Sequence, residues 1–132
     1  MQLLLDIAKS LFNYLKSNLE VRALQKLLPA LFNEMAHDLQ APGNKLKREF
    51  LLIRRRGAVY NGDPVLAYYY SDYEDLEDAI KIMLYKGLLR DVTQTNVKRY
   101  RFTEKLYDFL IKQKVDEDLL PVSPAEKLYG KN

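Results

Sequence analysis

The order of secondary structure in this protein is decided by residues 71–110, which read SDYEDLEDAIKIMLYKGLLRDVTQTNVKRYRFTEKLYDFL. Ser71 and Glu74 have the spacing of a capping box, in which a hydroxyl and a carboxylate satisfy the free amides at a helix start. Apolar residues at helical spacing follow, and Gly87 supplies the left-handed residue that commonly ends a helix. The segment therefore predicts a helix from Ser71 to about Gly87.

Two short strand-like runs follow this helix. Residues 88–93 and 97–102 are rich in apolar and β-favouring side chains, and the polar residues 94–96 separate them. Thr103 then begins another helix, which runs to about Lys112. The predicted order is helix, strand, turn, strand, helix.

The first 40 residues predict a helical appendage. Apolar residues recur at helical spacing along residues 4–19 and again along residues 24–39. Ser17 and Glu20 form a second capping box, so we expect a new helix to begin there. Pro29 must kink this helix or begin another, because proline removes a donor and crowds the preceding turn. Residues 41–44, Ala-Pro-Gly-Asn, mark the clearest boundary in the chain.

Two further helices are predicted between this boundary and Ser71. Leu46, Phe50 and Ile53 have helical spacing, which indicates a helix ending near residues 56–57. Asp63 and Pro64 read as a cap and a first helical residue, which favours a short helix over residues 64–70. Asn61-Gly62 is also a strong hairpin signal, so strands over residues 58–60 and 65–70 are the alternative.

Residues 63–109 resemble the winged helix-turn-helix domain of bacterial regulators of the MarR and PadR groups. The resemblance is carried by Leu66-Ala67, Ser71, the apolar spacing up to Gly87-Leu88, and the run from Tyr100 to Lys105. It implies a mainly α fold with a small β-wing (α+β). The predicted organisation is an N-terminal helical dimerisation element at 1–41, a winged-helix domain at 44–113, and a tail at 114–132 with a short final helix capped by Ser123. The shared residues are mostly core and cap positions, which specify fold better than function.

Charge is segregated along the chain, although the net charge is only +3. Residues 41–70 carry six basic and two acidic side chains, residues 92–115 carry the same numbers, and residues 71–91 carry three basic and six acidic ones. The helix that a winged-helix protein inserts into the major groove would therefore present carboxylates, which phosphates repel. Its exposed acids are Asp72, Glu74, Asp75, Glu77 and Asp78.

A winged-helix regulator of this sequence is therefore expected to contact double-stranded DNA through its wing and its basic first helix. Basic and amide side chains of these two segments suit phosphates and base edges. The predicted DNA-binding residues are Lys98, Arg99, Arg101, Thr95, Asn96, Lys47, Arg48, Arg54 and Arg55. The alternatives are that these charges are only solvated, or that Arg54 or Arg55 pairs with the acidic helix.

The rival hypothesis is a winged helix that binds protein and not DNA. Its acidic helix would meet a basic protein surface through Glu74, Asp75, Glu77 and Asp78, and ten tyrosines in 132 residues favour contact surfaces. The apolar N-terminal stripes also predict a homodimer, because one small wing cannot bury them all.

Composition argues against most other classes of function. Without cysteine there is no thiolate for catalysis or zinc binding, and His37 is the only histidine, expected at the surface or an interface. No phosphate loop, nucleophile motif or metal-ligand spacing occurs, so we expect no enzyme activity, no cofactor and no metal. No apolar run is long enough to span a membrane and no secretion signal is recognisable, which predicts a cytoplasmic protein.

Overall fold

The computed structural model describes residues 2–54, 65–121 and 128–129, and its architecture is α+β. The α-helices are α1 (Gln2–Leu27), α2 (Pro29–Gln40), α3 (Leu76–Tyr85) and α4 (Glu104–Ile111). The strands are β1 (Glu49–Ile53), β2 (Val65–Tyr69), β3 (Leu89–Asp91), β4 (Lys98–Phe102) and β5 (Leu128–Tyr129). The described residues also include three 3₁₀ turns: η1 (Pro42–Asn44), η2 (Tyr70–Asp72) and η3 (Glu117–Leu119). None of the described helices is long and apolar enough to cross a membrane.

The five strands form one mixed sheet in the order β3-β4-β1-β2-β5. The central strand β1 runs parallel to β2 and antiparallel to β4, and β3 and β5 pair antiparallel at the two edges. Since successive side chains of a strand point to opposite faces, this register assigns each strand residue to one of two faces. Phe50, Tyr68 and Tyr100 point to one face, whereas Glu49, Leu51 and Arg99 point to the other.

Helices α2, α3 and α4 pack on the face that carries Phe50. Its ring lies 5.0 Å from the ring of Tyr68, 5.8 Å from Tyr100 and 4.9 Å from Phe102, measured between centroids. Met35, Met83 and several leucines of the helices are fully buried in the same cluster. Because α2 belongs to this core, the boundary predicted at residues 41–44 lies inside the packed body.

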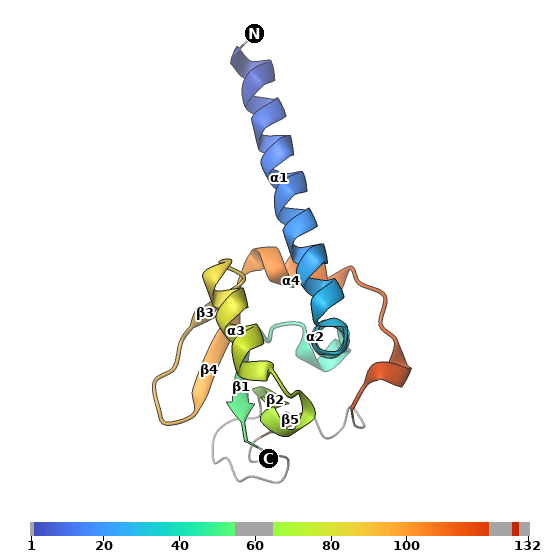
Figure 1. The fold of residues 1–132 in the computed structure, drawn as a ribbon, viewed down its shortest axis with the longest axis vertical. Helices are drawn as coiled ribbons and strands as arrows, with labels where there is room; N and C mark the ends of the chain where they lie inside the picture. The colour runs from blue at the N-terminus through green and yellow to red at the C-terminus, as the bar shows by residue number, and fades with distance from the viewer. Residues whose placement is uncertain (1, 55–64, 122–127, 130–132) are drawn as a thin grey trace.

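Helix α1 is the element that departs most from this compact arrangement. It extends from the body as a long projection, and only its C-terminal end packs against the core, through Val21 and Leu24 (Figure 1). The helix is continuous over residues 2–27, so the new helix start predicted at Ser17 is wrong. Pro29 occupies the first turn of α2, which confirms that it begins another helix, since proline is tolerated where the amide has no helical acceptor.

The two helices predicted for residues 46–56 and 64–70 are wrong where the structure describes them. Residues 49–53 and 65–69 are the two central strands of the sheet. Both strands are buried on both faces, so their apolar runs lack the alternation that marks a half-exposed strand. A short continuous apolar run does not distinguish a buried strand from a helix, and β-branched and aromatic residues in Val65–Tyr69 favour the strand. The described residues 44–70 therefore do not form the first two helices of a helix-turn-helix.

The order of elements predicted for residues 71–110 is largely confirmed. Helix α3 begins at Leu76, later than the predicted start, because η2 occupies residues 70–72. Gly87 has φ +72°, and the amides of Gly87 and Leu88 donate to the carbonyls of Leu84 and Met83 at 3.1 and 2.9 Å, which forms a Schellman cap. β3, β4 and α4 follow as predicted.

The tail differs from its prediction at its described end. We expected a short helix capped by Ser123 and reaching Tyr129. Residues 122–127 lie outside the described part of the chain, and Leu128–Tyr129 pair as strand β5 with Val65 and Leu66 of β2.

Candidate nucleic-acid interface

Three arginines lie on the sheet face opposite to the helices. Arg99 faces Leu51 and Arg101 faces Glu49 across the β1–β4 pair, and Arg90 faces Arg101 across the β3–β4 pair. Residues directly opposite in an antiparallel pair point to the same face, so the three guanidinium groups share one surface. We call this surface, made of Arg90, Arg99, Arg101 and Glu49, the arginine face.

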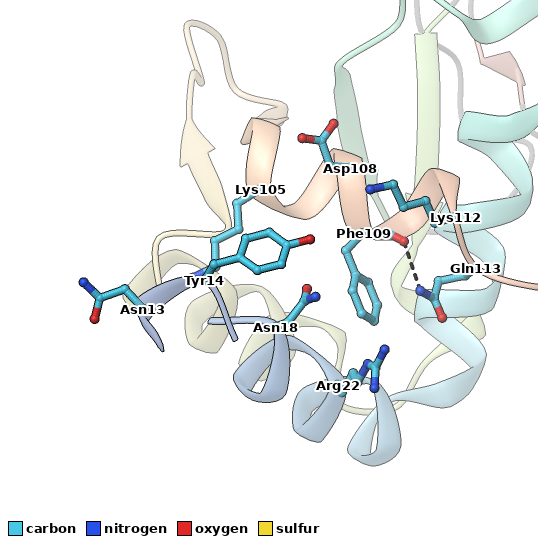
Figure 2. Close-up of a pocket in the computed structure, with 9 residues that line it drawn as sticks. All are labelled: Asn13, Tyr14, Asn18, Arg22, Lys105, Asp108, Phe109, Lys112 and Gln113. Carbon is cyan, nitrogen blue, oxygen red and sulfur yellow. Dashed lines mark hydrogen bonds between the residues drawn. The ribbon is translucent and has the colours of Figure 1, made fainter. Parts of the chain in front are cut away.

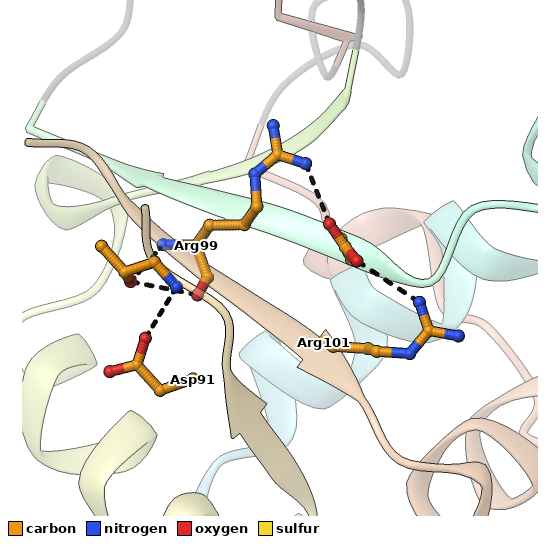
Figure 3. Close-up of polar contacts among 5 residues, drawn as sticks. Asp91, Arg99 and Arg101 are labelled. Carbon is orange, nitrogen blue, oxygen red and sulfur yellow. Dashed lines mark hydrogen bonds and ion pairs between the residues drawn. The ribbon is translucent and has the colours of Figure 1, made fainter. Parts of the chain in front are cut away.

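Glu49 organises two of these arginines. Arg99 donates to its Oε1 atom at 2.9 Å and Arg101 to its Oε2 atom at 3.3 Å (Figure 3). The side chains of Arg99, Arg101 and Glu49 are 30%, 46% and 31% exposed, so the cluster is open to solvent. One carboxylate therefore orients two guanidinium groups, and three positive charges against one negative leave the surface cationic.

The turn between β3 and β4 is held by local hydrogen bonds. The Thr93 amide donates to Asp91 Oδ1 at 2.9 Å, and the Arg99 amide donates to Thr93 Oγ1 at 2.9 Å. Hydrogen bonds from the Thr93 side chain, and then from its amide, lower the pKa of the Asp91 carboxyl. The Thr95 hydroxyl accepts from the Val97 amide at 3.2 Å. The predicted residues Thr95, Asn96 and Lys98 are exposed here, although Thr95 also maintains the turn.

The basic block predicted on a first helix is distributed differently. Arg48 precedes β1 and its guanidinium carbon lies 3.5 Å from the centroid of the Tyr107 ring, while its Nη1 atom donates to the carbonyls of Lys45 and Lys47. Arg54 follows β1 and is exposed. At about 3.3 Å per residue, the strand separates Arg48 from Arg54 by roughly 20 Å. Lys47 is half-buried, and Arg55 lies outside the described residues.

The acidic helix lies on the opposite side of the sheet from the arginine face. Leu76, Ile80 and Met83 of α3 are buried in the same cluster as Phe50 and Phe102. Glu74, Asp75, Glu77 and Asp78 are all exposed at its N-terminal end, as predicted. The sheet thus separates the two charge groups, an arrangement that follows from pairing between distant strands and cannot be inferred from the order of residues alone.

A buried polar cluster, which sequence reasoning missed, ties α2 to the sheet. Glu34 and Asp38, one helical turn apart on α2, are 1% and 2% exposed. The Tyr73 hydroxyl donates to Glu34 Oε1, and His37 Nδ1 lies 3.3 Å from Asp38 Oδ1. Burial raises the pKa of the Tyr68 hydroxyl, and nearby Asp38 and Glu34 raise it further. Among the described residues, no group of three or more acidic, histidine or cysteine side chains is arranged to hold a metal ion.

Concave regions border the helices in the described part of the chain. A cleft of about 590 Å³ lies between α1 and α4, where mostly polar side chains of the two helices face each other, among them Asn18, Arg22 and Lys112 (Figure 2). A smaller groove of about 290 Å³ lies between the start of α2 and the start of α3. Its floor includes Leu28, Leu31 and Ala79, and its rim includes Glu74 and Asp75.

Comparison of the chain with protein-family models, with curated proteins and with solved structures gave no significant match.

Proposed function

We propose that this protein binds duplex DNA through its arginine face and the adjoining β3–β4 turn, and acts as a small DNA-associated regulator. The observation that carries the proposal is the placement of Arg90 directly opposite Arg101, both exposed, with Arg99 on the same face. Like charges directly opposite in a sheet are destabilising. Phosphate groups between such guanidinium groups would remove this repulsion and gain charge-assisted hydrogen bonds.

The charge distribution supports a backbone-contacting mode. Arginine pairs with phosphate bidentately, and contacts of this kind give affinity without much sequence information. The acids of α3 lie behind the sheet, so they do not oppose an approach to the arginine face. The proposal keeps the winged-helix interpretation for α3, β3, β4 and α4, which follow one another in the predicted order. It assigns the DNA contact to the β3–β4 turn and the sheet, and not to a helix.

The decisive measurement is retention on duplex DNA over a series of salt concentrations. Arg90→Gln with Arg101→Gln is expected to weaken binding at least about 10-fold and to reduce the slope of log K against log salt by about 2. The matched control is Lys81→Gln with Lys86→Gln, which removes the same charge from exposed positions of α3 and the residue that caps it. Equal losses for the two double variants would contradict the proposal, as would absence of binding by the unmodified protein at low salt.

Glu49→Gln is expected to change DNA affinity in the opposite direction to the arginine substitutions. Removing this carboxylate breaks the two ion pairs that Glu49 makes with Arg99 and Arg101 and removes one negative charge from the arginine face. DNA binding is therefore expected to strengthen by several-fold at low salt, with a steeper salt dependence. A simple scaffold role for Glu49 would instead weaken binding, so the sign of the change distinguishes the two roles.

A second candidate function is recognition of a basic protein segment, and the acid-rimmed groove favours it. Its apolar floor and the exposed carboxylates of Glu74 and Asp75 would accept an apolar side chain flanked by lysine or arginine. Glu74→Lys with Asp75→Lys is expected to abolish such a contact while leaving DNA retention unchanged or stronger. A variant that keeps every protein partner of the unmodified chain would exclude this candidate.

A further inference from the structure

The N-terminal part of α1, residues 2–20, exposes an unusually large apolar surface. Its nine large apolar side chains are each at least 50% exposed: Leu3, Leu4, Leu5, Ile7, Leu11, Phe12, Tyr14, Leu15 and Leu19. Monomeric proteins rarely expose a contiguous apolar patch larger than a few hundred Å². We call this segment the arm. Helices in proteins are stabilised mainly by packing of their apolar face, so a helical arm with no partner would lack its main source of stability.

The apolar side chains of the arm occupy one side of the helix. At about 100° per residue, they fill an arc of roughly 200° centred near Leu4 and Leu11. Lys9, Asn13 and Lys16 lie on the opposite side, and Asn18 is the one polar residue of the arm inside the arc. The arc is much wider than the seam of a strict two-stranded coiled coil, so a partner would have to cover more than half of the circumference of the helix to bury it.

Helix α1 contributes buried residues to the core only beyond the arm, near its C-terminal end. Val21 and Leu24, the buried residues of the helix, lie roughly 100° and 160° around the axis from the centre of the arc. Arg22, which lies near the centre of the arc direction, is exposed. The body of the same protomer therefore buries only residues near the C-terminal end of α1, and the large apolar side chains of the arm stay exposed.

We infer that the arm is covered by the arm of a second copy of this chain, which makes the protein a homodimer. Residues 2–20 carry two acids and two bases, Asp6, Glu20, Lys9 and Lys16, so two arms do not repel each other by net charge. A helix that lies on a lipid surface characteristically has a polar face rich in lysine and arginine, which this one lacks. Nine side chains of this size expose several hundred Å² of apolar area, close to the roughly 800 Å² per partner of a standard interface.

The inference is independent of the proposed DNA contact, and solution mass tests it. Sedimentation equilibrium of the full chain is expected to give twice the 15.5 kDa chain mass. Leu11→Glu with Leu15→Glu places four carboxylates in the dimer interface and is expected to weaken dimerisation at least about 100-fold. The matched control, Gln2→Glu with Asn13→Glu, adds the same charge to exposed positions of the polar side and is expected to remain dimeric.

Two results would overturn the inference: a monomeric unmodified chain at about 100 μM, or a dimeric Leu11→Glu, Leu15→Glu variant. Thermal unfolding of that variant checks that the body still folds, since none of the changed residues belongs to the core cluster.

Cross-linking gives a second measurement in a folded protein. The chain has no cysteine, so Leu11→Cys introduces a single thiol that is expected to form a disulfide-linked dimer under mild oxidation. Asn13→Cys, on the polar side, is expected to cross-link at least about 10-fold less, and equal yields would contradict pairing through the leucines.

Discussion

The two faces of the sheet differ in what neighbouring strands place beside one another. On the helix-covered face, Phe50 packs against three aromatic rings, and the cluster is closed by leucines and methionines of α2, α3 and α4. On the other face, the adjacent positions of the same strands carry Glu49, Arg99 and Arg101 beside the buried Leu51. Along β4, neighbouring positions thus alternate between the aromatic core and the arginine face, whereas β1 places Glu49 on the second face beside a smaller buried apolar cluster that includes Leu51 and Ile53.

This difference shows how one strand can contribute both to the core and to a charged surface. Because successive side chains of a strand point to opposite faces, alternate residues contact different surroundings. Substitutions on one face are therefore expected to leave the other largely intact. The same sheet keeps the carboxylates of α3 away from the arginines. The acidic helix α3 and the basic β3–β4 hairpin follow each other in sequence but place their charged side chains on opposite sides of the sheet.

The largest effect is expected from Phe50→Ala on the helix-covered face. Phe50 is fully buried between rings of β2 and β4, so its removal leaves a cavity that the sheet cannot close. The free energy of unfolding is expected to fall by about 3–5 kcal/mol. Denaturant unfolding followed by circular dichroism measures it.

Glu49→Gln at the neighbouring position of β1 is the control for this comparison. Its ion pairs are partly exposed, and pairs of this kind contribute less than about 1 kcal/mol. If the two variants were destabilised equally, the two faces of β1 would not have separate roles.

The parts of the fold that were predictable from sequence are those whose structure is decided locally. The end of α3 needs only a residue that tolerates positive φ, and Gly87 identifies it; Thr103 and the apolar spacing after it similarly identify α4. The central strands β1 and β2 have no such local marker. Leu51 and Ile53 could serve equally on a buried helix, and only pairing with residues far away in sequence makes them a sheet.

The candidate interface was predictable in part for the same reason. The residue types of the wing indicated phosphate contact, and Arg99 and Arg101 do share a surface. Their ion pairs with Glu49, and the presence of Arg90 opposite Arg101, depend on strand register, which composition does not reveal. Sequence proximity groups Arg48 with Arg54, yet the guanidinium group of Arg48 stacks on Tyr107 of α4, an element more than 50 positions later.

A smaller effect is expected at the cap of α3, which determines where β3 begins and so where Arg90 lies. Gly87→Ala places a Cβ atom on a residue with φ +72°, although the site has no atom within 4 Å of that Cβ. The cost is therefore backbone strain alone, and the free energy of unfolding is expected to fall by about 1 kcal/mol. Thermal or denaturant unfolding measures it. A loss as large as that of Phe50→Ala would mean that the cap also supports core packing, in conflict with the open space around Gly87.

The smallest effect concerns Asp91, the last residue of β3, which lies opposite Tyr100 of β4. Hydrogen bonds from Thr93, first from its side chain and then from its amide, lower the pKa of the Asp91 carboxyl, and Lys98 lowers it slightly further. A carboxyl with a lowered folded-state pKa adds stability above its unfolded-state pKa, and this contribution is lost as pH falls through the folded-state value. Thr93→Val removes the side-chain hydrogen bond to Asp91 and the two that the hydroxyl makes with the Arg99 backbone, but keeps the one from the Thr93 amide, so the pKa of Asp91 is expected to rise part of the way to its ordinary value. Titration of the carboxyl carbon by NMR measures the shift. Thr95→Val, whose hydroxyl serves the Val97 amide instead, is expected to leave the pKa of Asp91 unchanged.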